Sequence, residues 1–156
     1  KDTVTWTTAS GLGVVALAGG LALWMRRRLV LVTVRGSSME PALRPGDRVL
    51  VHRRGLARVR RGQVVVLEPP LPGGLHRTGT AAASLDHRLW NIKRVVALPG
   101  DPIPAGVPNV ENTERVPPDA LVVLGDSASS TDSRQRGFYF ATDLLGVVVR
   151  QVSTRP

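Results

Sequence analysis

The first part of the chain is a long uncharged interval. No charged residue occurs between Asp2 and Arg26, where an arginine triplet begins. At about 1.5 Å per helical residue this interval spans about 35 Å, more than the roughly 30 Å of a bilayer core. Trp6 and Trp24 lie near its two ends, where interfacial aromatic residues are common in membrane helices. The pattern predicts one N-terminal transmembrane helix, with residues 1–28 forming a membrane anchor and its basic flank.

Two other interpretations of this interval stay open. One is a cleaved secretory signal, although an arginine triplet is a poor neighbourhood for its cleavage site. The other is a buried helix of a soluble domain. The positive-inside rule places the part that follows the triplet in the cytoplasm. The chain opens on Lys1 rather than on methionine, so basic residues upstream would change that count. Charge alone therefore leaves the orientation undecided.

Beyond the triplet, short β-branched runs alternate with turns rich in glycine and proline. The runs lie at residues 29–34, 47–53, 63–67, 89–98, 121–124, 138–140 and 144–149. We expect the second and third runs to form a strand pair joined by a basic connection, and the last two to supply a closing strand. Residues 69–88, rich in proline, glycine and alanine, predict a mobile loop. The pattern is typical of an all-β domain over residues 29–156, with short antiparallel strands in packed sheets or a partial barrel.

The composition narrows the kinds of partner and cofactor that the protein can bind. The chain of 156 residues carries a formal net charge of +9, which suits contact with nucleic acid or with phospholipid headgroups. Aromatic residues are few and do not interleave with the basic run, which argues against stacking on single-stranded nucleic acid. Cysteine is absent and the three histidines lack metal-ligand spacing, so we expect no disulfide, no metal and no other cofactor. Either anionic headgroups or solvent would face the central arginines, which are Arg44, Arg48, Arg53, Arg54, Arg58, Arg60 and Arg61.

Three polar features stand out among the apolar runs. Ser37 and Ser38 lie where the run at 29–34 breaks into a turn, Lys93 lies inside an otherwise apolar run, and hydroxyls and carboxylates cluster at 125–134. A serine hydroxyl is a weak nucleophile that needs a base, and without cysteine or a well-placed histidine that base would be a neutral lysine. The pKa of a lysine must then fall by about 2–3 units, which burial among apolar side chains achieves. Polar turns with a purely structural role are the other interpretation.

These features resemble the motifs of type I signal peptidases and occur in the family's order. Ser-Met-Glu-Pro stands at 38–41, and Lys-Arg-Val-Val-Ala-Leu-Pro-Gly-Asp stands at 93–101. Gly-Asp followed by Ser-Thr-Asp-Ser-Arg stands within 125–134. The resemblance covers most of the domain from residue 29 to residue 149. It implies a signal-peptidase-like all-β fold and a membrane-anchored serine endopeptidase with a Ser–Lys dyad.

The resemblance also implies a role for each matched residue. Ser38 would be the nucleophile and Lys93 the general base. Ser130 would hydrogen-bond the lysine and orient it, while Asp132 and Arg134 would form a structural ion pair that shapes the site.

Two further charged residues receive supporting roles by the same resemblance. Arg94 would join the ion pair, and Asp126 matches the first carboxylate of the third motif. The oxyanion would be held by the backbone N–H of Ser38 and by one further donor. Some members supply that donor from a serine two positions before the nucleophile, where this chain, like other members, has Gly36. Ser37 and a further backbone N–H are then the candidates.

The first functional hypothesis is removal of N-terminal signal or leader peptides from exported proteins through an acyl-enzyme. The implied substrates are preproteins with small residues one and three positions before the cut, and the other implied partner is the phospholipid membrane. No nucleic acid is expected. The resemblance implies a single-pass protein of the cell membrane whose domain lies on the extracytoplasmic face, against the simple charge count.

Three alternative functions stay open. The first is a dedicated maturation protease for one partner protein, and the second is a self-cleaving repressor-type Ser–Lys protein. The second would need an N-terminal DNA-reading domain and an internal cleavage site, and neither is visible in the sequence. The third is a basic β-module that docks on membranes or nucleic acid without catalysis.

Overall fold

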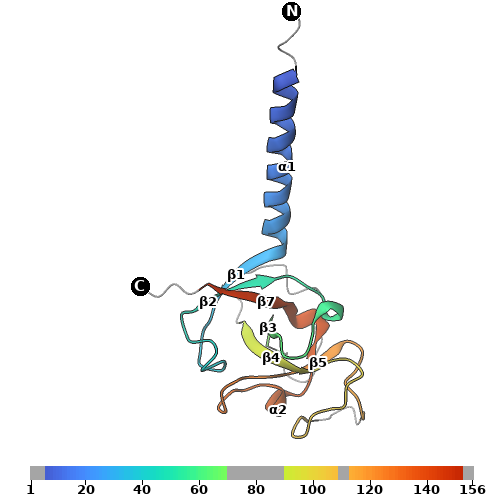
Figure 1. Ribbon diagram of the computed structural model, residues 1–156. Helices are drawn as coiled ribbons and strands as arrows, with labels where there is room; N and C mark the ends of the chain where they lie inside the picture. Colours follow the sequence, from blue (N-terminus) through green and yellow to red (C-terminus); the bar gives the residue numbers. More distant parts are fainter. Residues whose placement is uncertain (1–5, 70–89, 109–112, 153–156) are drawn as a thin grey trace, which may run out of the picture.

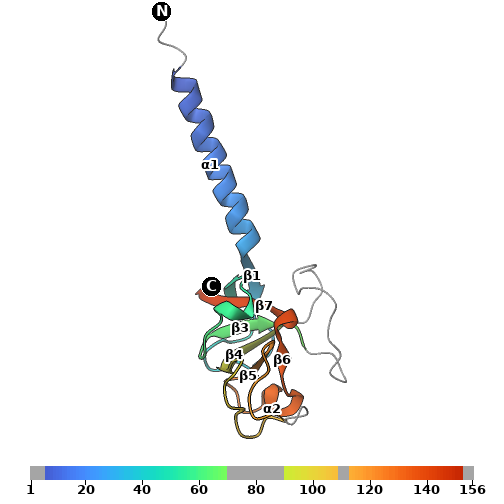
Figure 2. The same cartoon turned by 90° about the vertical axis from the view of Figure 1, so that its right-hand side faces the viewer.

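A curled antiparallel sheet, preceded by one long helix, forms the protein. The computed structural model describes residues 6–69, 90–108 and 113–152. Helix α1 (Trp6–Arg28) leads directly into strand β1 (Leu29–Thr33) and stands away from the sheet (Figures 1 and 2). The other strands are β2 (Arg48–His52), β3 (Val64–Leu67), β4 (Asn91–Ala97), β5 (Ala120–Leu124), β6 (Tyr139–Phe140) and β7 (Leu144–Val152). The described residues also form the single-turn helices η1 (Leu56–Arg58), α2 (Ser133–Arg136) and η3 (Ala141–Asp143).

The domain that follows α1 is mostly β, in keeping with the prediction, and each predicted run corresponds to a strand within a few residues. The run at 29–34 is β1, and the run at 89–98 contains β4. Of the predicted mobile loop at 69–88, all but Pro69 lies outside the described residues.

Helix α1 occupies most of the uncharged interval. It ends on three arginines, at the terminus where cations interact favourably with the helix dipole. Its side chains are described at residues 14, 16–21, 23, 24 and 26–28. Within the part of the chain that the structure describes, no helix combines the length and the apolar character needed to cross a membrane. The predicted transmembrane helix therefore has no support from the described residues.

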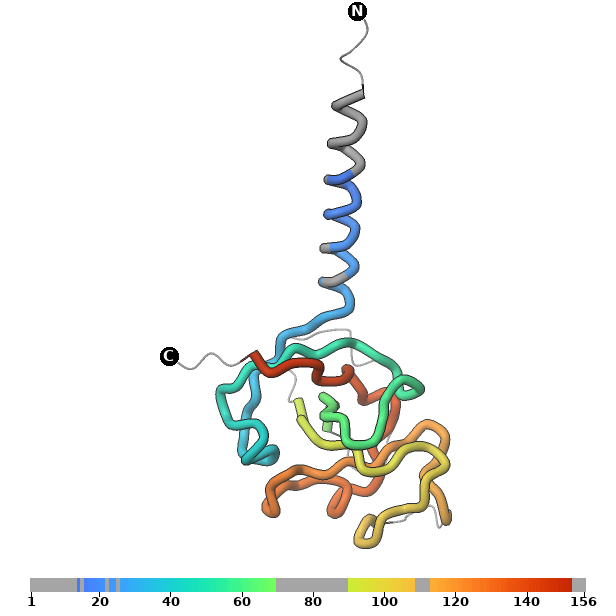
Figure 3. The backbone as a smooth tube through the Cα atoms, in the orientation of Figure 1, coloured from blue at the N-terminus to red at the C-terminus, as the bar shows by residue number. Residues whose placement is uncertain are grey.

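The strands follow the order β1-β2-β7-β3-β4-β5-β6, and neighbours are antiparallel. The predicted pair between 47–53 and 63–67 is wrong, because β7 lies between β2 and β3 and pairs with both. Figure 3 shows this last strand (red) running back beside segments from the first half of the chain. Strand β7 suits an interior position because successive side chains are apolar on both faces: Val147 and Val148 pack against different core clusters.

The two runs expected to supply a closing strand also separate. The turn η3 divides them, so β6 pairs with β5 at the far edge while β7 enters the middle of the sheet. A buried carboxylate, Asp143, stands at the end of that turn, and its backbone carbonyl accepts a hydrogen bond from the N–H of Glu68 (2.9 Å). This bond ties the end of η3 to the end of β3.

Apolar side chains pack on both faces of the sheet. Along β3, Val65 and Val66 belong to different clusters because successive side chains of a strand point to opposite faces. The first cluster contains Val32, Val34, Met39, Leu43, Val49, Val51, Val66, Ile92 and Leu145. The second contains Val59, Val65, Leu67, Val95, Leu121, Val123, Tyr139, Leu144 and Val147. A third lies around Val122 and Phe138 at the end that carries α2.

The close pairing of β2 with β7 predicts that the fold tolerates no side chain at Gly146 of β7. A Cβ added at Gly146 would lie 2.2 Å from the carbonyl oxygen of His52 and 2.9 Å from the Cα of Arg53, both backbone atoms that cannot move alone. We expect Gly146→Ala to lower the free energy of unfolding by about 3 kcal/mol, measured by denaturant titration of the full chain. Gly55→Ala is the control, because nothing lies within 4 Å of a Cβ there. A loss no larger for Gly146→Ala than for Gly55→Ala would contradict the close packing.

Candidate active site

The turn that carries Ser38 is held in place at three points. Its two ends are joined by a hydrogen bond from the N–H of Val34 to the carbonyl of Asp47 (2.8 Å). Met39 is 1% exposed and packs in the first core cluster. The buried carboxylate of Asp47 accepts a hydrogen bond from the side chain of Gln151 on β7 (2.8 Å). The turn is therefore fixed to the core on both sides of the serine.

Lys93 lies in the middle of β4 and points into the protein. It is 3% exposed and stands opposite Val65 of β3. Its neighbour Arg94 points the other way, as the alternation of a strand requires, and its side chain is 37% exposed.

The amino group of Lys93 has a single hydroxyl partner among the described residues. Its Nζ donates to the Oγ of Ser130 (2.7 Å), which is itself buried. Burial lowers the pKa of Lys93 below the usual lysine value, because it penalises the charged form. The charge of Asp132 acts against this, while Arg136 and Arg134 lower the pKa further. The site thus lowers the pKa of the amine and gives it one fixed hydrogen bond among the described residues.

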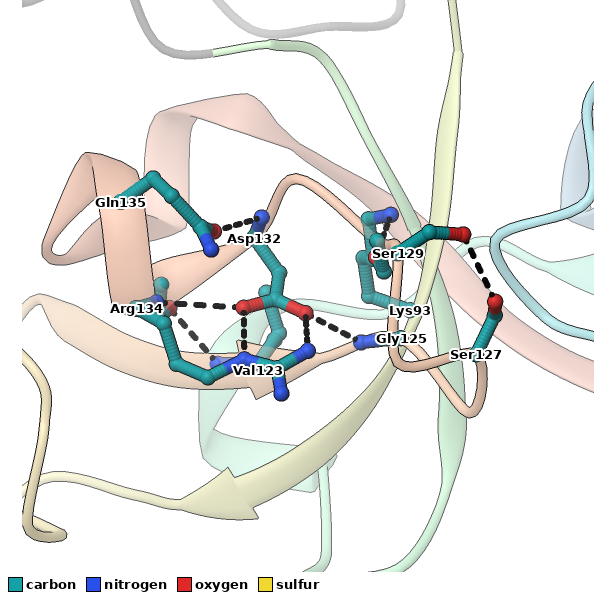
Figure 4. Close-up of polar contacts among 10 residues, drawn as sticks. Lys93, Val123, Gly125, Ser127, Ser129, Asp132, Arg134 and Gln135 are labelled. Carbon is teal, nitrogen blue, oxygen red and sulfur yellow. Dashed lines mark hydrogen bonds and ion pairs between the residues drawn. The ribbon is translucent and has the colours of Figure 1, made fainter.

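Asp132 and Arg134 form an ion pair beside the lysine. The guanidinium of Arg134 contacts both carboxylate oxygens, with Nε 3.0 Å from Oδ1 and Nη2 2.8 Å from Oδ2 (Figure 4). The same carboxylate accepts the N–H of Gly125 (2.8 Å) and of Arg134 (3.1 Å), so it caps α2 and holds the end of β5. Burial alone would raise the pKa of Asp132, but these hydrogen bonds lower it to about 2.

Arg94 does not join that ion pair. Its side chain instead binds Asp126 in a bidentate pair, with Nε 2.8 Å from Oδ1 and Nη2 2.6 Å from Oδ2. Its Nη1 also donates to the carbonyl of Gly62 (2.9 Å). The register explains why Arg94 binds Asp126 and not Asp132: Arg94 lies opposite Leu124, close to Asp126, and on the exposed side of the sheet. The two ion pairs therefore hold different parts of the 125–134 turn.

Gly125 is a site residue that the sequence prediction missed. A Cβ added there would lie 2.0 Å from the Oγ of Ser130 and 2.5 Å from the carbonyl oxygen of Ser38. The two serines thus meet across a position that leaves no room for a side chain. The only sequence signal was that this glycine opens the Gly-Asp motif.

The third motif also contacts the nucleophile candidate directly. The N–H of Ser127 donates to the carbonyl oxygen of Ser38 (3.1 Å). Together with the contacts at Gly125, this brings Ser38 next to the Lys93–Ser130 pair. Among the described residues no hydrogen bond joins the Oγ of Ser38 to the Nζ of Lys93. The structure therefore places the two residues in one site without showing their direct contact.

The oxyanion candidates lie at the start of the same turn. Gly36 adopts a φ of +80°, and Ser37 is exposed while Ser38 is half-buried. Within the described part of the chain, the N–H groups of all three residues have no backbone acceptor. They are consecutive donors that a developing negative charge could use.

Comparison with known proteins shows which protein family the sequence matches. Residues 6–105 match the sequence profile of the family described as signal peptidase, peptidase S26, and this match covers more than half of the chain. The chain belongs to the signal peptidase family. Its membership indicates serine peptidase activity of the signal peptidase kind. The matched residues include Ser38 and Lys93 but end before the 125–134 motif of this peptidase. A search of curated proteins gave no match.

The crowding at Gly125 predicts a loss of peptidase activity. Gly125→Ala would push Ser130 and the Ser38 backbone apart, so we expect kcat/KM to fall by about 100-fold or more. Ser129→Ala is the control, because this exposed hydroxyl contacts only that of Ser127 among the described residues (3.0 Å). It should keep activity within a few-fold. Equal activities for the two variants, measured on the same peptide, would show that the close approach is not needed.

The lowered pKa of Asp132 predicts how stability depends on pH. A carboxyl whose folded-state pKa is about 2 stabilises the fold above its unfolded value near 4, and this stability is lost as pH falls from about 4 to about 2. We expect Asp132→Asn to lower the free energy of unfolding by about 2 kcal/mol at pH 7, with a smaller difference from wild type below pH 4. Denaturant titrations between pH 2 and pH 7 test this.

Asp119→Asn is the matched control, because this residue is exposed in the turn before β5. Its free energy of unfolding should stay within about 0.5 kcal/mol of wild type. A difference between Asp132→Asn and wild type that did not change with pH would exclude the carboxylate charge as the cause.

Proposed function

We propose that this signal peptidase family member is a membrane-anchored endopeptidase that removes N-terminal signal or leader peptides from exported proteins. Ser38 is the nucleophile and Lys93 the general base. The observation that carries the proposal is the buried Lys93 amino group, held by Ser130 beside the turn that presents Ser38.

The proposed reaction uses one proton acceptor throughout. The neutral Nζ of Lys93 takes the proton from the Oγ of Ser38, and the oxygen attacks the scissile carbonyl carbon. Lys93 then gives that proton to the leaving amine, and an acyl-enzyme remains. A water molecule, deprotonated by the same amine, attacks the ester and releases the acid and the free serine. The hydrogen bond to Ser130 fixes the direction of the amine during both steps.

We assign the stabilisation of the oxyanion in both steps to hydrogen-bond donors of the serine turn. The N–H of Ser38 is the first, and the neighbouring N–H of Ser37 or the Ser37 hydroxyl is the second. Gly36 has no side chain to contribute, but its φ of +80° sets the direction of the turn. This proposal rests on the absence of backbone acceptors for these amides among the described residues.

Free strand edges support an extended substrate. Among the described residues, β1 pairs with β2 and with no other strand, so none of them pairs with its other edge. Within the same residues β4 pairs with β5 from Arg94 onward, and residues 91–93 have no strand partner on that side. A preprotein segment with small residues before the cut would add to such an edge by main-chain hydrogen bonds, and apolar side chains beneath would select small residues.

We place the catalytic domain on the extracytoplasmic face of the cell membrane. This placement rests on the family resemblance. It opposes the simple count of positive charges around Arg26. Protease accessibility of the domain in sealed vesicles of known orientation tests it.

Cleavage of a preprotein with a small-x-small site tests the activity. We expect Ser38→Ala and Lys93→Met each to lower kcat by about 1,000-fold or more, with Ser129→Ala as control. Activity requires a neutral lysine, so the rate should rise with pH through the Lys93 pKa and then level off. Because burial lowers this pKa, the rise should lie below the pH at which an ordinary lysine titrates.

Three outcomes would redirect the proposal. Retained activity in Lys93→Met would exclude the Ser–Lys dyad. Wild type that cleaves only itself would favour the repressor-type function, and wild type that cleaves one partner protein but no general preprotein would favour the dedicated maturation protease.

A further inference from the structure

One short turn connects the proposed nucleophile to the proposed base. The carbonyl oxygen of Ser127 accepts the N–H of Ser130 (3.1 Å), which closes a β-turn over residues 127–130. The first residue of this turn donates its own N–H to the carbonyl oxygen of Ser38 (3.1 Å). The hydroxyl of the last residue accepts the Nζ of Lys93 (2.7 Å). A continuous series of hydrogen bonds therefore runs from the main chain of the serine to the amine of the lysine.

The geometry of the turn limits the length of this connection. The Cα atoms at the two ends of a β-turn lie less than about 7 Å apart. A Cβ added at Gly125 would lie 2.0 Å from the Oγ of Ser130 and 2.5 Å from the carbonyl oxygen of Ser38. Both oxygens therefore lie within 2.5 Å of one point. The turn acts as a short spacer with one end on the nucleophile and the other on the base.

Two carboxylates hold this spacer in place. Asp126, directly before the turn, binds Arg94 through both of its oxygens (2.8 and 2.6 Å). Asp132, shortly after the turn, accepts the N–H of Gly125 (2.8 Å). Because Arg94 follows Lys93 on β4, side chains of one strand contact both the start and the end of the turn. The spacer cannot move along β4 without breaking one of these contacts.

The hydrogen bond from Ser127 fixes the peptide group that follows Ser38. The next side chain, Met39, is 1% exposed and packs in the first core cluster. The main chain of the serine is thus held by packing as well as by this hydrogen bond. The Oγ of Ser38 then moves chiefly by rotation about χ1. Its distance from the lysine is set by the spacer and not by the serine itself.

We propose that Ser127 is a positioning residue of the peptidase and that it acts through its main-chain N–H. This N–H holds Ser38 at the distance from Ser130 at which the serine hydroxyl reaches the amine of Lys93. The inference rests on the proposed Ser–Lys function and deepens it, because it names the group that sets the separation of nucleophile and base. A displacement of reacting groups by about 1 Å can cost about 100-fold in rate, so this single hydrogen bond determines much of kcat.

The side chain of Ser127 has a different partner from its N–H. Its hydroxyl contacts the hydroxyl of Ser129 (3.0 Å), and Figure 4 shows the two facing each other. The two groups can therefore be tested separately. A change of side chain leaves the N–H in place, whereas replacement of the peptide bond by an ester removes the N–H and keeps the course of the backbone.

Amide-to-ester replacement in the full chain tests the proposal. The reference is Ser127→Ala, and the test protein carries lactic acid at residue 127, so the two differ only in N–H against oxygen. We expect the ester to lower kcat for preprotein cleavage by about 10- to 100-fold and to leave KM within about two-fold. The pH at which the rate rises should not change, because Ser130 still holds Lys93. A general loosening of the site would instead expose the amine, raise its pKa and move the rise to higher pH.

Lactic acid at residue 128 is the matched control for ester chemistry. Among the described residues no backbone acceptor is bonded to the N–H of Ala128, the next residue of the turn. This ester should leave kcat within about two-fold of wild type. Equal kcat for the ester and the amide at residue 127 would overturn the inference. Equal losses from the two esters, or a rate that rises only at higher pH, would overturn it as well.

A thiol at the nucleophile position gives a measurement that does not depend on cleavage. The chain contains no cysteine, so Ser38→Cys introduces a single thiol. A thiol beside a basic amine loses its proton more readily, so it reacts faster with iodoacetamide at pH 7 than an ordinary thiol. We expect the ester at residue 127 to slow this alkylation about ten-fold, and the ester at residue 128 to leave it within about two-fold.

The two measurements separate this inference from the proposed activity. A wild-type protein that cleaves no preprotein would refute the proposed activity, and slower alkylation with the ester at residue 127 would still support the positioning of residue 38. An alkylation rate that this ester does not change would overturn the inference, whatever the result of the cleavage assay.

Discussion

The burial of the Lys93 amino group is the constraint on which the site depends. An amine taken out of water loses part of its tendency to hold a proton, so burial lowers the pKa of Lys93 in the direction that the proposed general base needs. The same burial would leave the amine without a partner if Ser130 were absent. The hydrogen bond between them satisfies the buried nitrogen and fixes its direction at once. Two adjoining strands and one turn are arranged so that this pair forms.

The 125–134 turn joins the parts of the site that lie far apart in the sequence. Asp132 binds the end of β5 through Gly125 and caps α2 beside Arg134. The turn also contacts the carbonyl of Ser38 and carries the hydroxyl that holds Lys93. A carboxylate with this many donors strongly resists protonation, so the turn keeps its shape over a wide pH range. The absence of a side chain at Gly125 lets all these groups approach one another.

The sequence by itself determined that the domain after α1 is mostly β and where its strands lie to within a few residues. Alternating apolar runs and turn residues are local signals, and Lys93 inside an apolar run already indicated a buried amine. Only the tertiary structure decided the order of the strands, because the insertion of β7 between β2 and β3 depends on packing on both of its faces. The same holds for Arg94, whose partner follows from the register of β4 and β5, and for Gly125. A glycine required by a close approach looks in sequence like any other turn glycine, since the atoms that exclude its side chain come from distant segments.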